Sequence, residues 1–276
     1  MPPARLIPCL LVLACAAPAA ALAAQPDPNP CLTDQAAALR CPDLVMRRPF
    51  GLYVDVKTRP TRVLLRAGNS LDNIGQGPAE LHGRRTSRWF MRARQRIYKR
   101  GGGRISVHTG ARLQFKLAHL GLHWWKFLHA AEFQLWRLDH QGNRIRLVRR
   151  GPKVSYCLRD LGHTRPGRPG SPRRWVYPAC STNRFARRDT LGTSVGWSDI
   201  YPAHYPAQWI DVTGLRGCFA YRQIADPRNG IFESNEHNNS AQVVVRLPLR
   251  PGHSWRRGCP GPDVGAGPPY DRSGEY

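Results

Sequence analysis

Short segments that alternate polar and apolar residues recur along this chain, and they constrain its fold more than any other feature. Clear examples are residues 51–57 and 208–213. Alternation with period two is the pattern of a strand with one buried face. Glycine, proline and asparagine separate the segments, and helical periodicity is almost absent. These observations predict an all-β protein, a β-sandwich with long irregular loops that disulfides hold together.

Further strands are expected at 61–66, 79–82, 104–117 (one or two strands), 144–148, 153–158, 217–224 and 242–247. A glycine turn is expected at 68–78, and a loop or long hairpin at 83–104. The aromatic stretch 196–213 is predicted to be a loop that leads into a strand. Its first half is assigned to the loop because Pro202 and Pro206 cannot donate to a β-ladder.

The first 24 residues have the pattern of a secretory signal peptide. Arg5 gives a basic start, 6–13 is an apolar run, and 21–23 is a small-residue cleavage site. Cys15 follows a sequence that faintly resembles a lipoprotein box. We divide the remaining chain into a Cys-containing arm (25–43), a β-sandwich domain (44–250) and a tail rich in Gly, Pro and Arg (251–276). No later apolar run is long enough to span a membrane.

The cysteines that follow the signal peptide are Cys31, Cys41, Cys157, Cys180, Cys218 and Cys259. An even number in an exported chain predicts three disulfides, for which 15 pairings exist. Proximity in the sequence favours Cys31 with Cys41 and Cys157 with Cys180. No Cys/His spacing indicates a zinc site. The expected location is extracellular or in the cell envelope.

The formal net charge is +24, and only five of the 42 basic residues are lysines. Such a charge predicts attraction to polyanions. For an exported protein we expect acidic cell-wall or surface polymers as partners, and no specific nucleic acid. The positive charge is spread along the chain rather than concentrated in one motif.

Several motifs occur in a characteristic order. They are NIGQGPAE (73–80), KVSYCL (153–158), GWSDIY (196–201), QWIDVT (208–213) and ESNEHNN (233–239). Together they resemble the lysyl oxidase family in its compact bacterial form, over about residues 42–247. The resemblance implies a secreted β-sandwich. The block 233–239 also has a structural reading, because Asn and Asp side chains cap turns.

The resemblance also implies a chemistry. Family members are copper amine oxidases whose cofactor, lysine tyrosylquinone, forms from a lysine and a tyrosine of the chain itself. The matching positions here are Lys153 and Tyr201. The cofactor converts primary amines, including peptidyl lysine on other proteins, to aldehydes and releases ammonia and hydrogen peroxide.

The copper motif of the family is absent from its expected place. Its ligands are three histidines in a His-x-His-x-His run, which period two places on one face of a strand. The corresponding positions are Leu122, Trp124 and Lys126, none of which is a competent copper ligand. His123 is expected to point to the opposite face. Weak candidates for a rebuilt site are the neighbouring or nearby His119, His123, His129 and His204.

Two functions are therefore compared. The first is a degenerate relative, or pseudoenzyme, that lacks the copper site and acts as a basic extracellular or cell-surface binding module. The second is an active copper and quinone amine oxidase. The residues at 122, 124 and 126 and the excess of arginine favour the first. Lys153 and Tyr201 favour the second.

Overall fold

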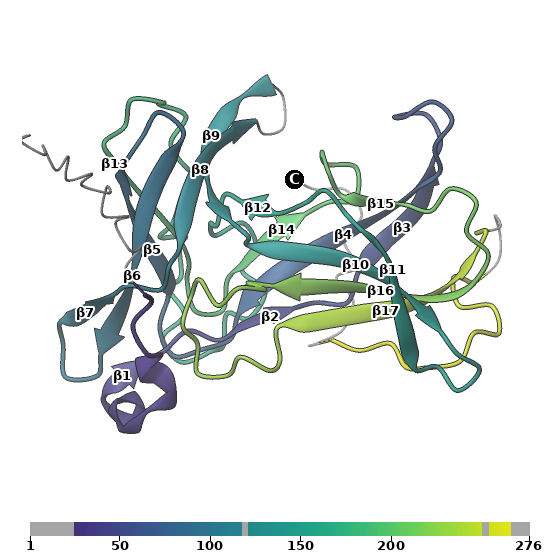
Figure 1. Ribbon diagram of the computed structural model, residues 1–276. Helices are drawn as coiled ribbons and strands as arrows, with labels where there is room; N and C mark the ends of the chain where they lie inside the picture. Colours follow the sequence, from purple (N-terminus) through teal and green to yellow (C-terminus); the bar gives the residue numbers. More distant parts are fainter. Residues whose placement is uncertain (1–24, 118–120, 250–253, 266–276) are drawn as a thin grey trace, which may run out of the picture.

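The computed structural model describes residues 25–117, 121–249 and 254–265, and these form an almost entirely β structure (Figure 1). The predicted fold class is confirmed. The expected signal peptide with Cys15 lies outside the described residues, as do His119 and parts of the predicted tail. Within the described ranges, no helix has the length and apolar character needed to cross a membrane.

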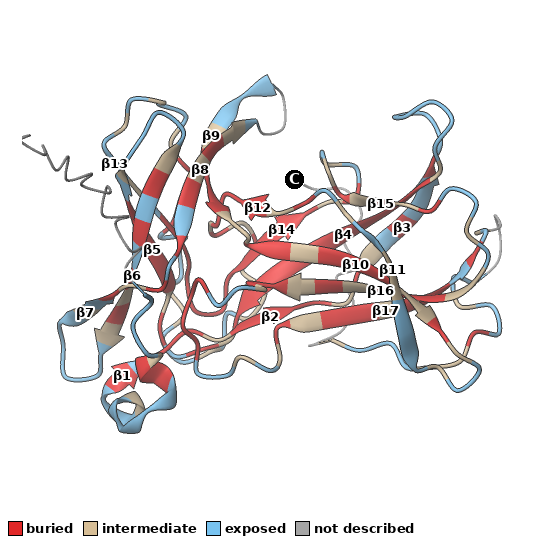
Figure 2. Cartoon of the chain, in the orientation of Figure 1, coloured by how far each residue is buried: buried red, intermediate tan, exposed pale blue. Residues whose placement is uncertain are grey.

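The largest sheet stands at one end of the molecule, at the left in Figure 1. Its strand order is β12-β9-β8-β6-β5-β13, and β1 and β7 also pair with β6. The strands are β1 (Leu39–Arg40), β5 (Ala79–Arg85), β6 (Phe90–Lys99), β7 (Arg104–Val107), β8 (Arg112–Leu117), β9 (His123–Leu128), β12 (Ser155–Tyr156) and β13 (Arg188–Thr193). In β6 the buried Met91 and Ala93 alternate with the exposed Arg92 and Arg94 (Figure 2), so one face of this sheet is solvated.

Two further antiparallel sheets pack against each other as a sandwich. One has the order β11-β10-β16-β17, and in the other β4 pairs with β2, β3, β14 and β15. The strands are β2 (Leu44–Met46), β3 (Phe50–Asp55), β4 (Leu64–Asn73), β10 (Ala131–Leu138), β11 (Arg144–Arg150), β14 (Ser198–Tyr201), β15 (Trp209–Asp211), β16 (Gly217–Ala225) and β17 (Ser240–Leu247). Strand β4 is buried along its whole length. Aromatic side chains such as Phe133, Phe219 and Tyr221 fill the core with Leu44 and Leu65.

The N-terminal arm contains two 3₁₀ helices, η1 (Pro30–Leu32) and η2 (Asp34–Ala38). Three disulfides cross-link the chain: Cys31–Cys41, Cys157–Cys180 and Cys218–Cys259. The first two pairings confirm the prediction from proximity. Each cross-link restricts the unfolded chain and thereby favours the folded one.

The segment 233–239 joins the arm to the sandwich. The fully buried Glu233 carboxylate accepts hydrogen bonds from the Leu44 amide and from Asn239 Nδ2, the latter at 2.8 Å. Asn29 Nδ2 donates to Glu236 Oε1 at 2.9 Å. These contacts support the structural reading of this motif.

Some predicted elements are wrong in extent. Strand β4 continues through Gly68, so the expected turn at 68–78 begins only after Asn73. The strand needs a glycine at position 68, because a Cβ there would lie only 2.5 Å from the Phe50 ring that packs against it. For residues 83–104, predicted to be a loop or a long hairpin, the hairpin is observed. The end of β5, strand β6 and the start of β7 form it. Within 153–158 only Ser155–Tyr156 is strand.

The segment 196–207 was expected to be loop, yet it contains the strand β14. Pro202 follows the last residue of that strand and therefore removes no ladder hydrogen bond from it. Of the strand expected at 208–213, only Trp209–Asp211 is strand, as β15.

Candidate functional site

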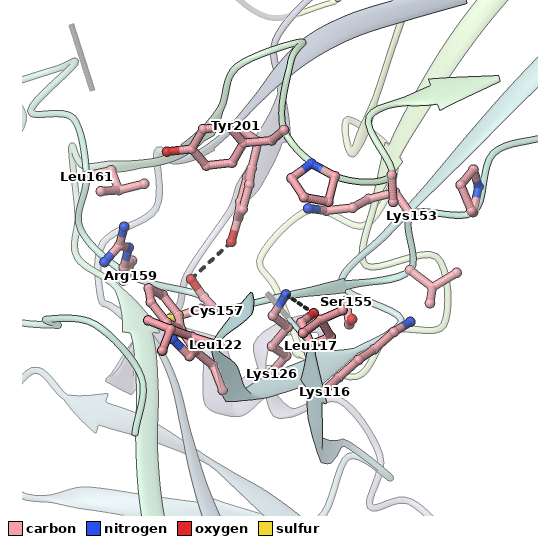
Figure 3. A pocket seen from close by; sticks show the side chains of 16 residues that line it. Lys116, Leu117, Leu122, Lys126, Lys153, Ser155, Cys157, Arg159, Leu161 and Tyr201 are labelled. Atoms are coloured by element: carbon pink, nitrogen blue, oxygen red, sulfur yellow. Dashed lines mark hydrogen bonds between the residues drawn. The ribbon is translucent and has the colours of Figure 1, made fainter. Parts of the chain in front are cut away.

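A pocket of about 280 Å³ lies beside the end of the large sheet. Strand β9, the segment that leads into β12 and the loop after β14 form its walls. Four of its lining side chains are basic, namely Lys116, Lys126, Lys153 and Arg159 (Figure 3). Leu122, Trp124 and Pro206 contribute apolar surface. The pocket therefore combines positive charge with an apolar wall.

Lys153 and Tyr201 meet in this pocket, although they are distant in the sequence. The Lys153 Nζ lies 4.0 Å from the centroid of the Tyr201 ring and 4.8 Å from that of Tyr156. The Tyr201 hydroxyl donates to the carbonyl oxygen of Cys157 at 3.3 Å (Figure 3). The pairing of β12 with β9 brings the lysine here, and the pairing of β14 with β4 positions the tyrosine.

Strand β9 and the residue before it present alternate side chains to the pocket. Leu122, Trp124 and Lys126 all line it. The His123 ring instead stacks on Phe115, with the ring centroids 5.6 Å apart. The Lys126 Nζ donates to the Leu117 carbonyl at 3.2 Å (Figure 3). The three positions thus share one face with Lys153 and Tyr201, and His123 lies on the other side.

The lysyl oxidase family model matches residues 76–255, which is more than half of the chain. This chain belongs to the lysyl oxidase family. It is 30% identical to protein-lysine 6-oxidase of Homo sapiens over 118 residues, which cover 42% of this chain and 25% of that protein. It is also 30% identical to the Sus scrofa protein of the same name over 115 residues, 41% of this chain and 40% of that protein. The match therefore spans less than half the length of either relative.

Lysyl oxidases typically use copper and lysine tyrosylquinone, so the donor set of this pocket decides whether copper fits. Leu122 has no donor atom, the Trp124 indole nitrogen carries a proton, and Lys126 ends in an ammonium group. The described part of the chain holds no group of three His, Cys, Asp or Glu side chains that could bind a metal ion. The residues at this face do not fit copper.

The other histidine candidates lie elsewhere. His129 follows the end of β9, at the turn into β10, with a φ of 64°. His204 lies in the loop after β14, where the centroids of its ring and the Tyr205 ring are 5.0 Å apart. Neither residue lines the pocket. The candidates His123, His129 and His204 are therefore not brought together in the pocket.

Burial and mutual repulsion weaken the basicity of the pocket lysines. Burial, together with the nearby charge of Lys126, lowers the pKa of Lys153 to about 7. Burial also lowers the pKa of Lys126 to about 8, with a contribution from Lys116. The buried Asp199 has a pKa raised well above its usual range by burial, which the charges of Arg159 and Lys153 oppose. Below neutral pH the pocket is thus strongly cationic.

Sequence reasoning missed Lys116, Arg159 and Asp199. Lys116 pairs with Trp124 in the β8–β9 register, which the sequence does not reveal. Arg159 lies two residues after Cys157, and its guanidinium is 5.2 Å from the Trp124 ring. Asp199 shares a strand face with Tyr201 by period two. The sequence contains this alternation, but it does not identify Asp199 when 196–207 is predicted to be a loop.

Proposed function

We propose that this protein is a copper-free member of the lysyl oxidase family that acts as a basic binding module outside the cell or on its surface. The observation that carries the proposal is that Leu122, Trp124 and Lys126 all line the pocket. These are the positions that the family resemblance assigns to the copper ligands. An ammonium group in place of an imidazole repels a divalent cation. Lys116 and Arg159 add to this repulsion.

Amine oxidation is the direct test of this proposal. The mature chain is expressed with copper and supplied with a primary alkyl amine and with a lysine-containing peptide. We expect hydrogen peroxide release no greater than that of the Lys153→Arg variant, and no visible absorbance from a quinone. Peroxide release that requires Lys153, accompanied by quinone absorbance, would refute the proposal.

The active amine oxidase is the second candidate, and one observation favours it. The Lys153 Nζ lies 4.0 Å from the Tyr201 ring centroid, so the two precursor side chains are in contact. Mass spectrometry of a tryptic digest separates the candidates. The copper-free module yields separate peptides for Lys153 and Tyr201, whereas an oxidase yields one cross-linked species.

Acidic cell-wall or surface polymers are the proposed partners. The net charge of +24 supports this, and the signal-like N-terminus and three disulfides support export to an oxidising compartment. Binding by charge requires that retention on an anionic polymer falls steeply as salt rises. Retention that does not change with salt would count against this partner class.

A further inference from the structure

A row of four arginines crosses the solvated face of the large sheet. Arg188 of β13 is the register partner of Arg84 in β5, Arg84 pairs with Arg92 in β6, and Arg92 pairs with Arg112 in β8. All four side chains are exposed. Directly paired residues point to the same face, and neighbouring strands lie about 4.8 Å apart. The row therefore places four positive charges on a line of about 15 Å.

This arrangement works against the stability of the sheet. Like charges directly opposite each other on paired strands are destabilising. No ion pair among the described residues includes any of the four arginines. The Arg112 guanidinium lies 4.4 Å from the Phe90 ring centroid, which is an uncharged contact. Any small polar residue would suit an exposed strand position, so the fold itself does not require this row.

The surface around the row is also basic. Arg94 is exposed on the same face of β6, and its guanidinium donates to Ser106. The exposed Trp89 lies in the turn between β5 and β6. The guanidiniums of Arg88, in the same turn, and of Arg184, in the segment before β13, lie 5.1 and 5.4 Å from its ring centroid. In Figure 2 the strands of this sheet carry pale blue, exposed bands between buried ones. The row is thus the regular centre of a wider basic surface, which we call the arginine face.

We propose that the arginine face binds a linear acidic polysaccharide that lies across the strands and places one carboxylate at each guanidinium of the row. Arginine suits this role because its planar fork binds a carboxylate through two parallel hydrogen bonds. The step of about 5 Å between strands is close to the length of one sugar unit, so each unit meets one strand. This inference rests on the proposed function as a binder of acidic polymers.

A polysaccharide fits this face better than a nucleic acid does. Proteins that bind single-stranded nucleic acid interleave basic side chains with aromatic platforms on which bases stack. The four partners in the row are all arginines. The rings beside the row, Phe90 and Trp89, each have an arginine guanidinium over them and so are not open platforms for stacking bases. The three disulfides also indicate a compartment in which wall and surface polysaccharides are accessible.

The test uses the mature chain and immobilised polygalacturonate. The double variant Arg84→Gln/Arg92→Gln removes the centre of the row. The control is Arg146→Gln/Arg149→Gln, which removes the same charge from exposed positions of β11 in another sheet. We expect the row variant to bind at least about tenfold more weakly and the control to change affinity by less than about twofold. The unfolding midpoint of the row variant should be unchanged or higher, because paired like charges are removed.

Each other outcome overturns a defined part of the proposal. Equal loss in both variants means that net charge binds the polymer, so the role of the row is wrong while the proposed function stands. Failure of the unmodified chain to bind any polyanion refutes the proposed binding function as well. Tighter binding to single-stranded DNA than to polygalacturonate at about 0.15 M salt refutes the choice of polysaccharide.

Discussion

Lys153 is a buried lysine of the pocket, and its surroundings disfavour the charged form of its amine. Only 7% of its surface is exposed, so its ammonium form is poorly solvated, and the charge of Lys126 lies nearby. Its pKa falls to about 7 in the folded protein from an ordinary value of 10.5. The residue is therefore an amine whose charge changes near neutral pH, whether or not it becomes part of a cofactor.

This pKa predicts how stability depends on pH. Between pH 7 and 10.5 the unfolded chain holds a proton on Lys153 that the folded chain has lost. Raising the pH through this window therefore favours folding, by up to about 1.4 kcal/mol per pH unit from this residue. In Lys153→Met this contribution disappears, so the variant should exceed the natural protein in stability most clearly below pH 7. Urea unfolding across this pH range measures the difference.

Lys57→Met is the matched control, because Lys57 is exposed. Its stability relative to the natural protein should not depend on pH in the same window. If the two variants show the same pH dependence, then Lys153 is not the titrating group.

At the scale of elements, the faces and the pairing of the strands decide which side chains line the pocket. Period two correctly placed positions 122, 124 and 126 on one face, because local alternation is enough to assign faces within one strand. The contact of Lys153 with Tyr201 followed from the family resemblance rather than from local pattern. The arginine row was not predictable, because it depends on the pairing of β13 with β5, which are far apart in the sequence.

The loop after β14, which carries the pocket residue Tyr205, is held by a buried arginine. The Arg66 guanidinium contacts Asp55 Oδ2 at 2.6 Å and donates to the carbonyls of Ala203 and Tyr205 at 3.3 and 3.1 Å. Replacing it by leucine removes the positive charge that pairs with the buried Asp55 carboxylate and the donor to the two carbonyl groups. We expect Arg66→Leu to lower the free energy of unfolding by about 3–5 kcal/mol, as measured in urea.

Arg62→Leu provides the comparison. Arg62 also pairs with an aspartate, Asp211, but its side chain is 58% exposed. Its loss should cost less than about 1 kcal/mol. Equal losses from the two substitutions would show that burial does not distinguish these ion pairs.

For the whole molecule, the net charge of +24 sets the response to salt. Repulsion among so many positive charges destabilises the compact state. Raising sodium chloride from about 0.01 to about 0.15 M shortens the screening length from about 30 to about 8 Å. We therefore expect Tm to rise by a few degrees over this range. The Arg84→Gln/Arg92→Gln variant should gain less, and a fall in Tm of the natural protein would contradict the prediction.

Copper stoichiometry tests the central claim most directly. The natural mature chain and the variant Leu122→His/Trp124→His/Lys126→His are expressed with copper, dialysed and analysed for bound metal. Because period two places the three imidazoles on the pocket face, the variant should bind about one copper ion per chain. The natural chain should retain almost none. A natural chain that holds one copper ion per molecule would contradict the account of this protein as a copper-free lysyl oxidase relative.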